Sequence, residues 1–267
     1  MNVYKFELSR LKKSILVWGL SVPGFLLFYL AFFPAMASSG DAFSDLMMTM
    51  DPKFLAAFGI IPELPVSEIL GYYNLTIGLI LIPLAIQASN YGFHILSVEE
   101  RELTADFLFT KPISRKKIIT SKFLAALTSL LIVDLVLTVF TVIAISSFKG
   151  DQVVALRNVF ILMLSIPLFQ LTFMSIGMVI SVSIKKVSSV LSFSMGLGFG
   201  MFVLSSFGSI LSSESIKYLT PYSHFNSAYV LINGSWNWEL LWISLTVMVL
   251  SLVASYFLYL KRNIASL

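Results

Sequence analysis

The chain has 267 residues, of which 57% are hydrophobic and only 12% charged, and its mean hydropathy is +0.89. These values lie far outside those of soluble domains and predict a protein that crosses a membrane several times. The absence of cysteine excludes disulfides, thiolate metal sites and cysteine nucleophiles. The net charge of +4 does not indicate a nucleic-acid partner, because the basic residues separate by side of the membrane.

The first residues predict a helix that lies on the membrane surface. Tyr4, Leu8, Leu11 and Ile15 repeat at helical spacing, while the basic residues of this stretch fall on its other faces. The apolar run that follows is too long for the core of a cleavable signal sequence. We therefore expect an interfacial helix that turns sharply into the first span.

Six apolar runs are long enough to cross a bilayer, so the predicted organisation is a single transmembrane domain, residues 1–267. The spans are expected at about 15–36, 71–96, 123–148, 153–184, 187–211 and 239–260. Residues 37–70 are too charged to span, and we expect them to form one or two short outer helices that either gate a path or only pack as a lid. The predicted fold class is all-α, a polytopic membrane protein with six transmembrane helices and an N-terminal interfacial helix.

The basic residues predict the orientation. Of the 18 Lys and Arg residues, all but Lys53, Lys149, Arg157 and Lys217 fall in the two ends of the chain or in the loops after the second and fourth spans. The positive-inside rule places that side, and with it both termini, in the cytoplasm.

Polar side chains within the spans mark candidate pathway positions. Gln87, Ser89, Asn90 and His94 occupy the inner half of the second span, where polar groups are costly toward lipid and are expected to face the bundle or an aqueous path. Asp134 lies near the middle of the third span. Either Ser, Thr or Asn groups of neighbouring helices satisfy it, or it touches a transport path.

The fifth span is rich in serine and glycine, which lets helices approach closely. Gly196 and Gly200 form a G-x-x-x-G, a pattern that serves packing within one chain as often as dimerisation. With Ser192 they are candidates for an interface between two membrane subunits, or for a pathway.

Residues 97–122 form the only long charged segment. If 98–109 is helical, it carries an acidic stripe with an apolar pair beside it. The acidic members are Glu99, Glu102 and Asp106, and the apolar pair is Leu103 and Phe107.

Pro112 ends that helix, and Ser114 is placed to cap the next one. Arg115, Lys116 and Lys117 then occupy a first turn, where cations oppose the helix dipole and lipid phosphates would offset the cost. A solvated loop with no further role is the alternative interpretation of the whole segment.

The order E-E-R-E-L-T, then L-F-T-K-P-I-S-R-K-K-I, then a lysine before an apolar span resembles the first cytoplasmic loop of bacterial ATP-binding-cassette permeases of the type-2 exporter family. The likeness in order of spans and outer segments covers the whole chain. It implies that the loop contains a cytoplasmic coupling helix that docks into an ATPase subunit. The residues implied to make this contact are Glu99, Glu100, Glu102 and Asp106, by hydrogen bonds to basic groups, and Leu103 and Phe107, as the apolar anchor.

The resemblance further implies two copies of a cytoplasmic ATPase, a second permease copy or a paralogue, and membrane lipids as partners in the plasma membrane of a bacterium. The implied function is ATP-driven export, although the substrate does not follow from the resemblance. We expect an amphiphilic substrate, such as a lipid, a peptide or a drug-like molecule, because an interface at the fifth span would leave a route between the two permeases. The sequence has no P-loop motif, so ATP and Mg are expected in the partner chain, with no cofactor, metal or catalytic residue in this one.

Two other functions fit the composition. A membrane scaffold or assembly factor would use the same loop to recruit a cytoplasmic partner without transport. An ion- or proton-coupled carrier would need inverted repeats and broken helices in matching places, which the sequence does not show.

Overall fold

The computed structural model describes residues 3–38, 49–101, 113–184 and 187–261, and at 99–101 it describes the backbone only. These residues are helical or form turns, and their extended pairing is a single bridge between Ile61 and Leu64. Six helical segments among them are long and apolar enough to cross a membrane. The prediction of an all-α polytopic membrane protein is therefore confirmed.

Each span is a long helix, and short helices connect some of them. The spans are α2 with α3 (Lys12–Ala31 and Phe33–Ser38), α6 (Ile69–Arg101), α8 (Arg115–Phe148), α9 (Leu156–Ser183), α10 (Val190–Leu211) and α14 (Trp238–Lys261). The short helices are α1 (Val3–Arg10), α5 (Pro52–Ala57), α11 (Glu214–Lys217), α12 (Pro221–His224) and α13 (Ser227–Asn233).

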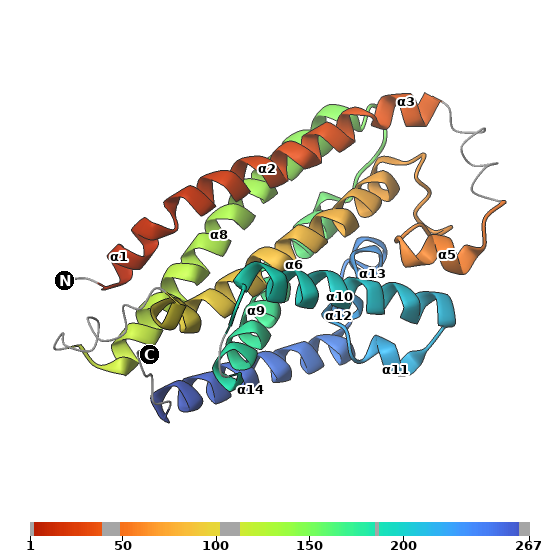
Figure 1. Ribbon diagram of the computed structural model, residues 1–267. Helices are drawn as coiled ribbons and strands as arrows, with labels where there is room; N and C mark the ends of the chain where they lie inside the picture. Colours follow the sequence, from red (N-terminus) through yellow and green to blue (C-terminus); the bar gives the residue numbers. More distant parts are fainter. Residues whose placement is uncertain (1–2, 39–48, 102–112, 185–186, 262–267) are drawn as a thin grey trace.

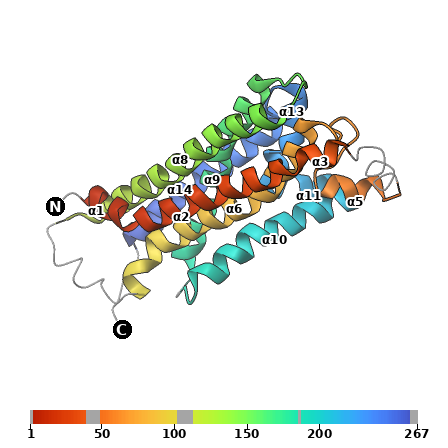
Figure 2. The same ribbon diagram turned by 90° about the horizontal axis from the view of Figure 1, so that it is seen from above.

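The bundle has two chemically different ends. Helix α1, the C-terminal end of α6, the start of α8 and the end of α14 gather at one end, on the left in Figure 1, and Figure 2 agrees. We call this the basic end. Its described basic residues are Lys5, Arg10, Lys12, Lys13, Arg115, Lys116, Lys117, Lys122 and Lys261. Helices α3, α5 and α11 lie at the opposite, far end.

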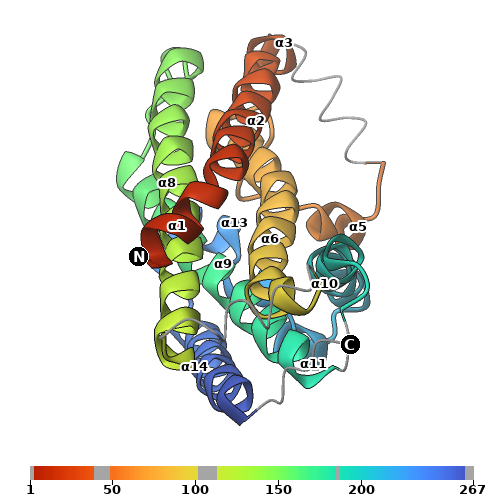
Figure 3. The same ribbon diagram turned by 60° about the vertical axis from the view of Figure 1, so that its left-hand side comes forward.

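Helices α6 and α9 form the centre of the bundle. In each of them 61% of the most apolar window is buried, compared with 17% in α10 and 22% in α2 and in α14. Figure 3 shows α6 with α2 and α8 on one side and α10 on the other. Three of the spans therefore leave most of their surface open to lipid or to another subunit.

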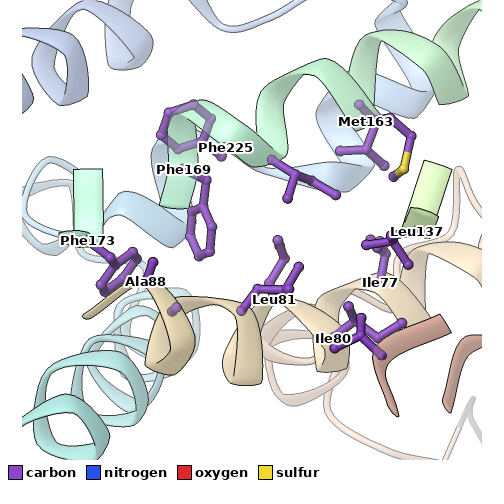
Figure 4. Packing of buried hydrophobic residues seen from close by; sticks show 14 of the residues in the cluster. Ile77, Ile80, Leu81, Ala88, Leu137, Met163, Phe169, Phe173 and Phe225 are labelled. Atoms are coloured by element: carbon purple, nitrogen blue, oxygen red, sulfur yellow. The ribbon is translucent and has the colours of Figure 1, made fainter. Parts of the chain in front are cut away.

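The core between α6 and α9 is built from aliphatic side chains facing aromatic ones. Figure 4 shows Leu81 and Ala88 of α6 on the side of Phe169 and Phe173 of α9, while Ile77 lies beside Leu137 of α8 and below Met163. The two aromatic rings are 4.9 Å apart, edge to face, a favourable arrangement for neighbouring rings.

Two glycines bring the backbones of α6 and α9 into contact. A Cβ atom on Gly92 would overlap the carbonyl oxygen of Met174, and one on Gly177 would lie 3.0 Å from the carbonyl oxygen of Ser89. This is the close helix approach that small residues permit in membranes.

The helix boundaries differ from the expected ones at two places. The first span begins at Lys12 rather than at about residue 15 and is interrupted at Phe32, and Pro34 lies in the first turn of α3. Pro at this position needs no backbone partner for its missing N–H. Helix α6 continues to Arg101, about five residues beyond the expected end of the second span.

We predict that Gly92→Ala lowers the temperature of unfolding in detergent, because the added methyl group must push α6 away from the α9 backbone. Overpacking of this kind costs about 1–3 kcal/mol. Gly78→Ala is the matched control on α6, since nothing lies within 4 Å of its Cβ position. It should be neutral or slightly stabilising, because alanine is the better helix former. Equal melting temperatures for Gly92→Ala and the wild type would contradict the close approach.

Candidate functional site

The segment expected to couple the chain to a partner lies at the basic end. Glu99 and Glu100 fall in the last turn of α6, as its continuation rather than as the start of a separate helix. Glu102, Leu103, Asp106 and Phe107 lie outside the described residues, so the predicted amphipathic helix stays a prediction.

The start of α8 follows the sequence prediction. Ser114 has an extended backbone, and its hydroxyl accepts a hydrogen bond from the amide of Lys117 at 3.3 Å. Arg115 is half-buried, and Lys116 and Lys117 are exposed. The predicted cap at Ser114 is confirmed, and α8 begins with three cations in its first turn.

Lys122 is a residue whose position the sequence reading missed. It was expected within the loop, but it lies inside α8 and is only 4% exposed. Its ammonium group donates a hydrogen bond to the carbonyl oxygen of Ile95, at 3.2 Å. This bond therefore joins α6 and α8, the two helices that flank the charged segment in the sequence. The spacing of the sequence could have indicated that Lys122 is buried, because it falls four residues from both Ile118 and Ala126 on the buried face of α8.

The N-terminal helix is fastened to the same helices. The hydroxyl of Tyr4 on α1 lies 3.0 Å from that of Thr128 on α8. The hydroxyl of Tyr91 on α6 lies 2.8 Å from those of both Ser14 and Ser129. Helices α1, α2, α6 and α8 therefore meet at the basic end through hydroxyl groups.

A buried polar group joins three spans near the middle of the bundle. Gln87 on α6 and Gln170 on α9 are fully buried, and Asp134 on α8 is 5% exposed. With the amide nitrogen of Gln170 turned toward Asp134, it donates to both carboxylate oxygens, at 2.9 and 3.1 Å. The amide of Gln87 approaches that of Gln170 to 3.4 Å. The partner of Asp134 is thus a glutamine, which was not among the groups expected to satisfy it.

The remaining polar residues of the second span divide between interior and surface. Ser89 is fully buried, whereas Asn90 and His94 are half-buried and line a hollow together with Ser188 and Ser189, at the start of α10. Asn90 and His94 therefore border an accessible hollow, while Gln87 belongs to the interior network.

Helix α10 presents its small residues on two different faces. Ser192, Gly196 and Gly200 are exposed, and nothing lies within 4 Å of the Cβ positions of the two glycines. Gly198 faces α6, where a Cβ would lie 2.8 Å from the Ile86 side chain. The G-x-x-x-G pair is therefore not used for packing within the described part of this chain.

At the far end, the short helices α5, α11 and α12 pack against α10. The described part of the first outer segment packs there through α5, and the amide of Asn74 donates to the carbonyl of Gly59 at 2.6 Å. A polar cavity of about 110 Å³ lies between α5, α6, α10 and α12. This arrangement is compatible with either a gate or a lid.

His224 in α12 has structural partners. Its Nδ1 lies 2.6 Å from the Ser244 hydroxyl and its Nε2 3.2 Å from the carbonyl oxygen of Tyr218. Burial lowers the pKa of the imidazole, although the bond to that carbonyl opposes the shift. No group of three or more metal-ligating side chains occurs among the described residues.

Six apolar helices, with charged groups concentrated at one end, define a multi-pass membrane protein. Residues 1–264 match the family described as ABC-2 family transporter protein, and the chain belongs to that family. Family membership makes it a transmembrane transporter subunit and implies association with an ATP-binding-cassette ATPase in general. No curated protein matches the chain.

We predict that Asp134→Asn retains the fold and Asp134→Leu does not, because asparagine still accepts a hydrogen bond from Gln170. Leucine leaves a buried amide donor without a partner, at a cost of about 1–3 kcal/mol. Thermal unfolding in detergent measures both variants, and Leu135→Ala on the exposed face of α8 is the control. A leucine variant as stable as the wild type would show that the pair does not hold α8 to α9.

Proposed function

We propose that this chain is the membrane-spanning subunit of an ATP-driven exporter that moves an amphiphilic substrate, such as a lipid, a peptide or a drug-like molecule, out of the cell. Family membership over residues 1–264 is the observation that carries the proposal. The sequence contains no P-loop motif, so ATP and Mg are assigned to a partner ATPase in two copies.

The proposed orientation places the basic end on the cytoplasmic side of a bacterial plasma membrane, so that both termini lie in the cytoplasm. The distribution of basic residues supports this orientation, because all but four of the 18 Lys and Arg residues belong to the two ends of the chain or to the loops after the second and fourth spans. The exposed cations at the start of α8, Lys116 and Lys117, then lie against the inner leaflet, where anionic lipids attract them.

In the proposed mechanism, the ATPase acts on the segment around Glu99–Phe107. This segment is continuous with α6 and leads into α8, and the bond between Lys122 and Ile95 couples these two helices. A push on the segment therefore moves both helices as one body. The contact of Gly198 with Ile86 passes motion of α6 to α10.

The exposed face of α10 is assigned to the interface with a second permease, either a copy or a paralogue. Ser192, Gly196 and Gly200 place small residues on that face, so two helices can approach closely there and separate without exposing large polar groups. A substrate route between the two permeases follows from this assignment.

The alternative is a scaffold that recruits a cytoplasmic partner without transport. It would use the same basic end but would not need the exposed face of α10 to loosen during a cycle. Transport by the purified complex separates the two functions.

Replacing both Leu103 and Phe107 with Ser should release the ATPase. Each apolar anchor contributes about 1.5–3 kcal/mol when buried, so association should fall by more than about tenfold. The tagged chain is purified from its native membranes, and the Mg-ATP hydrolysis that co-elutes is measured. Leu108→Ser is the control, because helical spacing predicts residue 108 on a different face from the pair Leu103 and Phe107. If the double variant keeps both co-eluting hydrolysis and export, these residues do not couple the two subunits.

Single cysteines at Ser192 and Gly196 should form disulfides between subunits. At an interface of two closely packed α10 helices, equivalent positions come within the distance of about 7 Å between Cα atoms that a disulfide requires. The cysteine-free sequence makes each introduced thiol unique. Ser194→Cys is the control, because Ser194 is buried against the inner helices and should not react. Oxidation of membranes, followed by non-reducing electrophoresis, measures the dimer. Crosslinking at Ser194 but not at Ser192 or Gly196 would place the interface elsewhere.

A further inference from the structure

A partly open cavity lies at the basic end, and the mechanism above uses only the bond between Lys122 and Ile95 on its wall. It has a volume of about 220 Å³ and lies between α1, α6 and α8. One buried water needs about 10–15 Å³, so the cavity can hold a much larger group. Its polar lining consists of Glu7, Arg10, Tyr91, His94 and Lys122, together with the Ile95 backbone.

The charges on this lining favour an anion. Arg10 and Lys122 carry two positive charges and Glu7 one negative charge, so the charged side chains of the lining have a net charge of +1. Lys122 is 4% exposed, and its ammonium group is anchored by the carbonyl of Ile95 at 3.2 Å. A buried cation is stabilised when an anion approaches it within hydrogen-bonding distance.

The walls of the cavity are held in place before any ligand arrives. The Tyr91 hydroxyl lies 2.8 Å from the hydroxyls of Ser14 and Ser129, on two different helices. The contact of Tyr4 with Thr128 fixes α1, which supplies Arg10 and Glu7. A prearranged site loses less entropy on binding than a flexible one.

Helix α1 supplies Glu7 and Arg10 to the lining of the cavity, and Arg10 at the end of that helix is exposed. Lipid headgroups lie at this depth if α1 rests on the membrane surface, and basic pockets between spans on the cytoplasmic side bind phosphorylated headgroups. We propose that the cavity between α1, α6 and α8 binds a phosphate group, with Arg10 and Lys122 as its ligands. The phosphate belongs either to an anionic phospholipid or to a free phosphate ion. The site does not depend on transport, so it can exist whether or not the proposed function holds.

Binding is measured by native mass spectrometry of the intact chain in detergent, with dioleoyl-phosphatidylglycerol as the probe. Dioleoylglycerol, which has the same acyl chains and no phosphate, is the comparison ligand. Lys122→Gln and Arg10→Gln should each weaken phosphatidylglycerol binding by about tenfold or more, the loss of one charge-assisted hydrogen bond. Glu7→Gln should strengthen it, because it removes the negative charge from the lining.

Lys117→Gln is the matched control, since Lys117 is an exposed cation on the same helix as Lys122. It should change binding by less than about twofold, because an exposed charge is screened by solvent. If Lys122→Gln does not fold, Arg10→Gln still tests the proposal, because substitution of an exposed residue is expected to leave the fold intact.

Inorganic phosphate separates the two sources. If it competes with phosphatidylglycerol in the wild type but not in Arg10→Gln, free phosphate also occupies the site. If it does not compete while the variants still lose the lipid, the source is the lipid headgroup. Equal binding of phosphatidylglycerol and dioleoylglycerol, or equal losses in Arg10→Gln and Lys117→Gln, would overturn the proposal.

Discussion

The contact between the backbones of α6 and α9 is the constraint on which the rest of the bundle depends. Glycine at 92 and 177 removes the side chains that would separate the two helices, and 61% of each apolar window is buried as a result. The other spans pack around this pair. Because lipid offers apolar side chains the same environment as a core, close packing rather than water exclusion must hold such helices together. A methyl group at this contact therefore disturbs more than one helix pair.

Polar groups inside the bundle follow a second constraint, since each must find a partner without water. Several buried hydroxyls solve this locally by donating to a carbonyl one turn earlier, as Thr76 does to Tyr72 and Ser97 to Phe93. Such bonds do not join helices. Links between spans come from the hydroxyl of Tyr91 and the ammonium group of Lys122 at the basic end, and from the amide of Gln170 and the carboxylate of Asp134 in the middle. The same few residues that are costly in lipid thus set which helices move together.

The sequence predicted the number of spans and the cap at Ser114, because both depend on local signals: the length of an apolar run, and a serine after a proline. It did not predict that α6 runs to Arg101 or that Lys122 is buried. Charge alone assigned those residues to a loop, whereas the Ile95 carbonyl across the bundle makes the buried lysine tolerable. The partner of Asp134 was missed for a related reason, since Gln170 is 36 residues away along the chain and only the packing of α8 on α9 brings the two together. The residues of the expected coupling contact stay predictions.

The two faces of α10 show how one helix can serve two kinds of contact. Gly198 lets α10 pack against Ile86 of α6, whereas no described residue lies within 4 Å of the Cβ positions of Gly196 and Gly200. Glycine costs roughly 1 kcal/mol relative to alanine in a helix, so two exposed glycines destabilise α10 unless another surface packs against them. The two glycines thus give α10 an exposed face that this chain does not pack, while Gly198 on its other face joins α10 to α6 and through α6 to the basic end.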